Sequence, residues 1–229
     1  MFRNYFKTAW RSIKKNKLFS FINILGLSIG IAVCFIIMLY VQDELSYDRF
    51  NKNADNIVRI VFNANMNGGK IDESAVMAPV AEIMKKDYPE VQDATRLVQT
   101  GSPKITFNNK VFKDDEVAVV DPNFFSIFTL PFIEGDAKTA LAQPNTIVIT
   151  KSTAEKYFGK EDALNKTLGF NNNTEFHKVT GVVENIPSNS HFHFDMFASM
   201  MSWEPAKSDS WMYGNFYTYL LLKPGTDYK

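Results

Sequence analysis

Residues 19–41 read FSFINILGLSIGIAVCFIIMLYV, and this stretch sets the organisation of the whole chain. It carries no charge, and its only clearly polar side chains are Ser20, Asn23 and Ser28. At about 1.5 Å per residue, a helix of this length exceeds the roughly 30 Å hydrocarbon core of a bilayer. The stretch therefore predicts a transmembrane helix, which we place at residues 18–42.

Charge is segregated on the two sides of this span. Six basic residues and no acid precede residue 43: Arg3, Lys7, Arg11, Lys14, Lys15 and Lys17. The whole chain has 25 Lys+Arg and 25 Asp+Glu, so residues 43–229 hold 19 basic and 25 acidic residues, a net charge of −6. The positive-inside rule places the N-terminus in the cytoplasm and the main domain in the periplasm, with the chain in the inner membrane. A chain without overall positive charge gives no reason to expect a nucleic-acid partner.

A cleaved signal peptide is the alternative interpretation of the span. Its apolar region would run for 7–15 residues and end at a small-residue A-x-A site. The apolar stretch here is longer and no such site follows it. We therefore expect the helix to remain in the membrane.

One face of the expected helix is lined by small or polar residues. Asn23, Gly26 and Gly30 are spaced by three or four, and the two glycines form a GxxxG motif. Small residues let helix backbones approach closely, and an amide in lipid needs a hydrogen-bond partner. We interpret this face as a packing surface for another helix, although glycine is also simply frequent in membrane helices.

Residues 1–17 place Phe2, Phe6, Trp10 and Ile13 at helical spacing, with basic residues between them. This pattern is typical of an amphipathic helix on the inner leaflet of the membrane. The alternative is a basic topology signal whose aromatic residues are incidental.

Residues 54–229 show a mixture of strand and helix patterns, and residues 43–53 are expected to link them to the span. The fold class is therefore α+β, with one N-terminal transmembrane helix and a mixed extracytoplasmic domain. Alternation and turn residues predict strands at 57–62, 70–77, 91–99, 104–107, 110–120, 146–150, 167–170, 176–184, 191–198 and 216–222. Turns are expected at Asn67-Gly68-Gly69, Asn108-Asn109 and Asn171-Asn172-Asn173.

Three helices are predicted from their end signals. One begins at Pro79 and stops before Pro89, and a short one follows Asp121 as N-cap with Pro122 at its first position. Phe124, Phe125 and Phe128 on the short helix are expected in the core. The third has Ser152 and Glu155 as a capping box and ends at Gly159.

Motifs for catalysis and cofactor binding are absent from the sequence. It contains no G-x-x-x-x-G-K-[ST], G-x-G-x-x-G or H-E-x-x-H, and its single Cys excludes a zinc site built from cysteines. His191, His193 and Asp195 would share one face of a strand and could hold a metal, but a solvent-facing polar row is the simpler interpretation. Ser, His and Asp residues are present, yet nothing ties them into a hydrolase triad, and Ser12-x-x-Lys15 lies in the basic segment. We expect no enzyme activity, no metal and no cofactor.

Several stretches together resemble the MacB/FtsX-type ABC transporter permeases. The opening FKTAWRSIKKNKLFSFINILGLSIGIAV is similar to the family's first membrane helix and its basic lead-in. VDPNFFSIFTLPFIEGDAKTAL, NTIVITKSTAEKYFG, VTGVVENIPSNSHFHFD and FYTYLLLKPGTD are similar to its MacB-like periplasmic core domain. YDRFNKNADNIVRI resembles the subgroup common in Bacteroidota. The resemblance covers essentially the whole chain.

The resemblance implies a permease subunit that works with a cytoplasmic ABC ATPase. ATP binding closes the ATPase dimer, and membrane helices transmit the motion to the periplasmic domain for export or release of a substrate. It also implies a second permease copy or half, and a periplasmic adaptor in some members. Family permeases have four membrane helices per unit, so with one span we expect this chain to be a fragment with an incomplete domain. The alternatives are a single-span sensor or adhesion protein and a membrane-anchored hydrolase.

Overall fold

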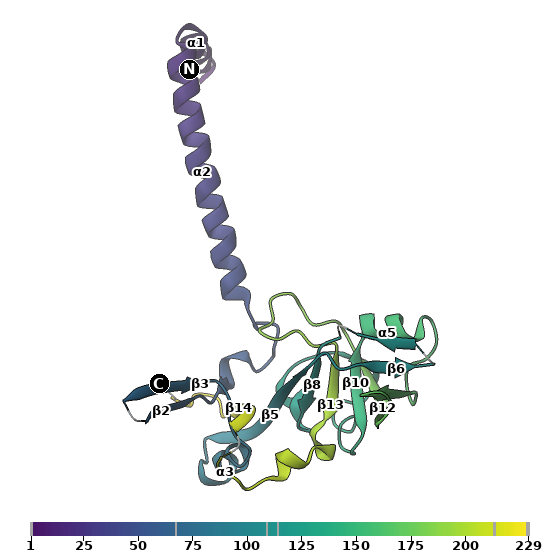
Figure 1. Cartoon of the computed structure of the whole chain (residues 1–229). Helices are drawn as coiled ribbons and strands as arrows, with labels where there is room; N and C mark the ends of the chain where they lie inside the picture. Colours follow the sequence, from purple (N-terminus) through teal and green to yellow (C-terminus); the bar gives the residue numbers. More distant parts are fainter. Residues whose placement is uncertain (1, 67, 109, 114, 213, 228–229) are drawn as a thin grey trace. The chain divides into compact units, whose positions relative to one another are not determined.

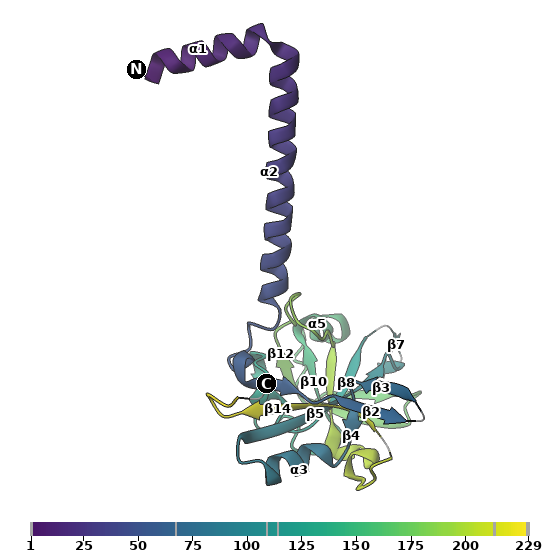
Figure 2. The ribbon, with the colours of Figure 1, turned by 90° about the vertical axis from the view of Figure 1, so that its left-hand side faces the viewer.

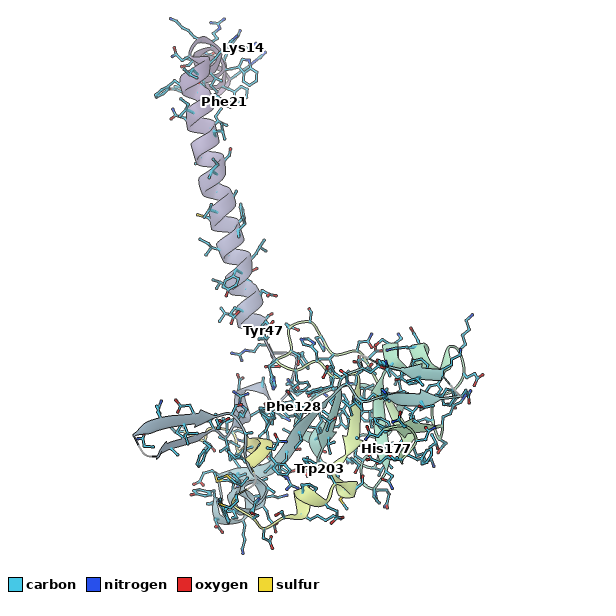
Figure 3. All side chains as sticks on the ribbon, in the orientation of Figure 1. Lys14, Phe21, Tyr47, Phe128, His177 and Trp203 are labelled. Carbon is cyan, nitrogen blue, oxygen red and sulfur yellow. The ribbon has the colours of Figure 1, made fainter. Side chains whose placement is uncertain are left out.

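The computed structural model describes residues 2–66, 68–108, 110–113, 115–212 and 214–227, and divides into two compact units, Met1–Tyr47 and Asp48–Lys229. The N-terminal unit contains helices α1 (Phe2–Lys15) and α2 (Lys17–Ser46). Helix α2 is long and apolar enough to cross a membrane, and none of its residues is buried. Its side chains stand out from the helix into open space (Figure 3). Of the segment expected as a linker, residues 43–46 extend α2, and residues from Asp48 onward belong to the second unit.

The second unit combines a large mixed sheet with short helices (Figure 1). Its helices are α3 (Val80–Asp87), α4 (Phe124–Ile127), α5 (Lys151–Phe158) and the 3₁₀ turns η1 (Ala54–Asn56), η2 (Met200–Ser202) and η3 (Glu204–Lys207). Its strands are β1 (Ile57–Arg59), β2 (Phe62–Met66), β3 (Gly69–Glu73), β4 (Val76–Met77), β5 (Val91–Gly101), β6 (Ile105–Phe107), β7 (Lys110–Phe112), β8 (Val117–Val120), β9 (Phe132–Gly135), β10 (Thr146–Thr150), β11 (Thr167–Phe170), β12 (Glu175–Val183), β13 (Met196–Ser199) and β14 (Gly214–Leu222).

The order of strands in the main sheet is β1-β14-β5-β8-β13-β10-β12-β11-β6-β7. Strand β4 also pairs with β14, and β9 with β12, whereas β2 and β3 form a separate hairpin. The pairs β8–β13 and β10–β12 are parallel, and the other pairs are antiparallel. Strand β14 pairs with β1 on one side and with β5 on the other, so it is an interior strand of the sheet, and Figure 2 shows it beside β5.

Both faces of the central strands are covered, because neighbouring residues along them enter two different cores. Val148 and Phe197 belong to a core with Phe124 and Phe125 of α4 and with Phe128, which directly follows α4. Their sequence neighbours Ile147, Ile149 and Met196 belong to a second core with Tyr157 and Phe158 of α5. Side chains alternate between the faces of a strand, so α4 covers one face and α5 the other. The prediction that the α4 phenylalanines are core residues is confirmed.

Most predicted strands exist, but several boundaries were wrong. The segment 57–62 is divided between β1 and β2, 110–120 between β7 and β8, and 191–198 contracts to β13. Strand β9 was missed. Asn67 and Asn109, on which two turn predictions rest, lie outside the described residues. Asn171, Asn172 and Asn173 all have positive φ, which confirms the third turn.

The predicted caps of two helices were also wrong. Helix α4 begins after Asn123, and the carboxylate of Asp121 instead accepts two hydrogen bonds from the Arg96 side chain. Helix α5 is capped by Thr150, whose hydroxyl accepts from the backbone N–H of Thr153. The end of α5 at Gly159, with φ +67°, is confirmed. The helix predicted from Pro79 is also confirmed, as α3.

Candidate functional site

The face of α2 predicted for packing forms an open groove. Asn23, Gly26 and Gly30 line it together with Cys34 and neighbouring apolar side chains. A Cβ atom built on Gly26 or Gly30 would meet nothing within 4 Å, so the space above both glycines is free within the N-terminal unit.

The predicted basic residues lie in both helices of this unit. Arg3, Lys7, Arg11, Lys14 and Lys15 belong to α1, and Lys17 is the first residue of α2. All six side chains are exposed.

The histidine-rich segment does not form a metal site. His191, His193 and Asp195 precede β13 rather than lying on a strand, and among the described residues no group of three or more His, Cys, Asp or Glu side chains is placed to hold a metal. Asp195 accepts a hydrogen bond from the backbone N–H of Glu116, at 2.8 Å. Phe192 and Phe194 are buried, as predicted, and His193 is exposed, but Asp195 is part-buried rather than facing solvent.

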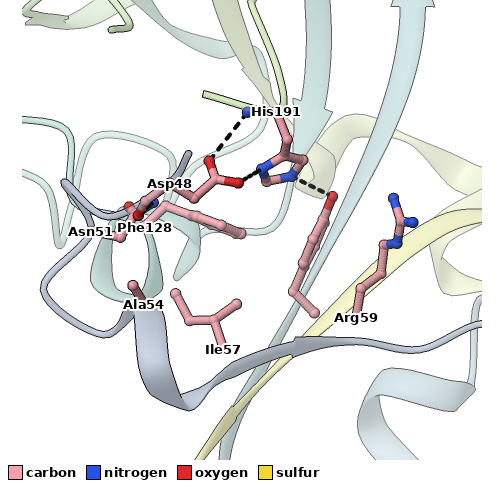
Figure 4. Close-up of a pocket in the computed structure, with 8 residues that line it drawn as sticks. Asp48, Asn51, Ala54, Ile57, Arg59, Phe128 and His191 are labelled. Carbon is pink, nitrogen blue, oxygen red and sulfur yellow. Dashed lines mark hydrogen bonds and ion pairs between the residues drawn. The ribbon is translucent and has the colours of Figure 1, made fainter. Parts of the chain in front are cut away.

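His191 contacts Asp48 and Tyr219, and Asn51 donates to Asp48; we call these four residues the Asp48 junction. Figure 4 shows Asp48, Asn51 and His191 of this group. Asp48 Oδ2 lies 2.8 Å from His191 Nδ1, and His191 Nε2 lies 2.9 Å from the Tyr219 hydroxyl. A carboxylate can only accept, so Nδ1 carries the proton and, in the neutral ring, Nε2 accepts from the hydroxyl. The backbone N–H of His191 also donates to Asp48 Oδ1, at 3.2 Å.

Backbone geometry adds to this attachment. Asp48 has φ +58°, a left-handed conformation in which Asp and Asn are enriched, and its N–H donates to the carbonyl of Asn189 at 2.8 Å. Asn51, only 5% exposed, accepts from the N–H of Thr129 at 2.9 Å and donates to the Asp48 carbonyl at 3.2 Å. The segment that follows α2 in sequence is therefore bound to the loop at 189–191 and to the end of α4.

A pocket of about 380 Å³ lies beside the junction, with Ile57, Arg59 and Phe128 among its other lining residues. Burial raises the pKa of Tyr219 to about 12, and the nearby Arg59 opposes this shift. The hydroxyl is therefore protonated at neutral pH and acts as a hydrogen-bonding group rather than as a nucleophile. Chemically, the junction is a chain of hydrogen bonds that holds one segment against β14.

Sequence reasoning identified His191 but not its partners. From the sequence, Asp48 was assigned no role of its own, and Tyr219 was placed only within the strand predicted at 216–222. The available signal was that YDRFN directly after the span and SHFHFD both stand out as polar-aromatic stretches. Their proximity in space depends on the sheet topology, which neither stretch contains.

Comparison with known proteins extends these observations. The model of the family described as MacB-like periplasmic core domain matches residues 20–229. The chain belongs to this family. The family is one of ABC transporter permease components. A search of curated proteins finds no significant match.

Solved structures show the same fold. A domain of a putative permease protein from Porphyromonas gingivalis is 27% identical, with a TM-score of 0.69 over 77% of each chain. The periplasmic region of MacB from Actinobacillus actinomycetemcomitans is 17% identical, with a TM-score of 0.54 over 76% of this chain and 77% of that one. The extracellular domain of the noncanonic ABC-type transporter YknZ from Gram-positive bacteria is 13% identical, with a TM-score of 0.53 over 74% and 85%. The MacB-like fold predicted from sequence is thus confirmed.

Proposed function

We propose that this chain is a permease subunit that couples ATP hydrolysis by a cytoplasmic ABC ATPase to movement of its periplasmic domain, for export or release of a substrate. In this proposal residues 1–17 are cytoplasmic, 18–42 span the inner membrane, 43–53 connect, and 54–229 form the periplasmic core domain. Family membership and the apolar helix α2 support it.

The observation that carries the proposal is the Asp48 junction. Asp48 is the second residue after the end of α2 at Ser46, and its carboxylate, carbonyl and N–H are all bonded within the second unit. Movement of α2 would therefore act on Asp48, a residue that hydrogen bonds hold in place within the second unit. Through His191 and Tyr219 it would reach β14, an interior strand of the sheet.

The open groove of α2 supports a helix partner. We propose that Asn23, Gly26 and Gly30 pack against another membrane helix, from a second permease copy or half, because small residues permit close approach and the amide needs a partner in lipid. A periplasmic adaptor would contact the second unit.

Topology is tested by labelling single cysteines in a C34S background with a membrane-impermeant maleimide. K110C should react in intact spheroplasts, and K7C only after the membrane is permeabilised. The reverse pattern would contradict the proposed orientation.

Coupling is tested by reconstituting the full chain with a candidate ABC ATPase from the same organism. D48N keeps a residue suited to the left-handed backbone but removes the charge, and H191Q removes the imidazole. Both should reduce stimulation of ATP hydrolysis while the ATPase still co-purifies, whereas H193Q at an exposed site should not. Normal stimulation in D48N and H191Q would disprove the role of the junction, and absence of any ATPase association would favour a single-span receptor.

A further inference from the structure

Helix α1 has two chemically different faces. Phe6, Trp10 and Ile13 project from one face with side chains 74%, 55% and 42% exposed. Arg3, Lys7 and Lys14 follow one another at spacings of four and seven, so they form a basic row along one border of that face. No acidic residue occurs in residues 1–42 to neutralise this row.

The apolar face and the basic row meet in a groove lined by Arg3, Phe6, Lys7 and Trp10. The Lys14 ammonium lies 5.7 Å from the centre of the Trp10 ring, so a third cation borders the same aromatic side chain. An indole prefers the level of lipid headgroups, with acyl chains on one side and water on the other. The groove thus offers cations to a phosphate and an apolar floor to the adjoining glycerol and acyl carbons.

We propose that α1 is a binding site for anionic phospholipids, with headgroup phosphates on Arg3, Lys7 and Lys14 and the Phe6–Trp10–Ile13 face in the acyl region. The proposal rests on the proposed membrane insertion of α2. Only Asn16 separates α1 from α2, so covalent connection keeps α1 at the bilayer surface. This favours lipid over a surface of the ATPase, which would have to supply acidic groups of its own.

The proposal makes charge, and not apolar area alone, the determinant of binding. Each basic residue near an anionic membrane increases the affinity for the membrane by about fivefold. Removal of three such residues should therefore lower the affinity of α1 for anionic lipid by about 10²-fold. The attraction should also decline as salt screens the charges.

The test uses the full chain in nanodiscs, with W203F and W211F so that Trp10 is the only tryptophan. Brominated phosphatidylglycerol should quench Trp10 strongly at low salt and weakly at high salt, and phosphatidylcholine discs without anionic lipid should leave Trp10 more accessible to acrylamide. R3Q/K7Q/K14Q should abolish the preference for phosphatidylglycerol. The control K104Q/K110Q/K113Q removes the same charge from exposed sites in the second unit and should change nothing.

Equal Trp10 protection in both lipids, or protection in R3Q/K7Q/K14Q that equals the parent, would overturn the proposal. Protection that appears only when the ATPase is added would assign α1 to a protein surface instead, and also overturns it. The salt titration of the parent needs no substitution in α1. The cysteine labelling reports orientation regardless of lipid preference, so the two proposals fail separately.

Discussion

The Arg96 side chain donates four hydrogen bonds within the second unit. Its guanidinium makes a two-point contact with the Asp121 carboxylate, with both distances 2.9 Å, and also donates to the carbonyls of Ala78 and Ala206. Both side chains of the pair are less than one-fifth exposed. The Arg96 side chain therefore joins β5 to the residue after β8, to the segment before α3 and to η3. Each of its three side-chain nitrogens donates at least one hydrogen bond.

R96A should destabilise the domain by about 3–5 kcal/mol, because it leaves a poorly solvated carboxylate without its cation. K85A is the matched control, since the Lys85–Asp93 pair is more exposed and should contribute at most about 1 kcal/mol. Urea unfolding of the full chain in detergent, followed by tryptophan fluorescence, measures both. Equal effects of the two substitutions would refute the ranking.

The phenol of Tyr219 makes stability depend on alkaline pH. Its folded pKa is raised to about 12, while an unfolded tyrosine titrates near 10, so folding favours the protonated form. Its contribution is present below pH 10 and is lost as pH rises from about 10 to 12. Y219F should remove this part of the loss of stability at alkaline pH. It should also remove one late-titrating phenol from the absorbance titration, and an unchanged titration would contradict the assignment.

At the scale of elements, glycines determine where strands approach closely. Strand β9 ends at Gly135, which has φ +86° and pairs with Gly181 of β12. A Cβ at Gly135 would lie 2.5 Å from the Thr180 carbonyl oxygen and 2.9 Å from Gly181 Cα. Because these are backbone atoms, the pairing of β9 with β12 requires glycine there.

G135A should therefore destabilise more than G101A. Gly101 has φ +71° but open space around it, so alanine there adds only backbone strain of about 1–2 kcal/mol. At Gly135 the clash adds about 1–3 kcal/mol more. Thermal unfolding of the two variants tests this difference, and it would be refuted if G135A were the milder change.

Local sequence signals predicted many elements but not how they meet. Gly159 correctly predicted the end of α5, because the residue there has a positive φ, which favours glycine. Ser152 and Glu155 suggested a capping box. The N-cap is instead Thr150, the residue directly before the helix, whose hydroxyl accepts from the backbone N–H of Thr153. The backbone N–H of Ser152 donates to the side chain of Asn185. Asp121 looked like a cap and instead pairs with Arg96, which is 25 residues away in sequence. Asp48 and His191 of the Asp48 junction are 143 residues apart, beyond the reach of any local pattern.

At the scale of the whole molecule, the apolar α2 has no described partner within its own unit. Its groove is therefore where assembly should be sensitive to side-chain volume. G26L/G30L should reduce co-purification of a differently tagged second copy, or of another permease half, by roughly fivefold or more. S28L/A32L has the same spacing on the opposite face and is the matched control. Equal loss in both pairs would indicate a general effect on the helix rather than a packing face.

The place of β14 has a consequence for how the protein is made. Ile57 of β1 pairs with Leu221 of β14, so β1 has no partner strand in the main sheet until the ribosome has added 164 more residues. At about 5–20 residues per second, this delay is on the order of 10 to 30 s. In the proposed topology β1 would spend that time without its partner strand outside the cytoplasm, beyond the reach of ATP-driven chaperones. In this topology, biogenesis therefore depends on how fast the ribosome and translocon deliver β14.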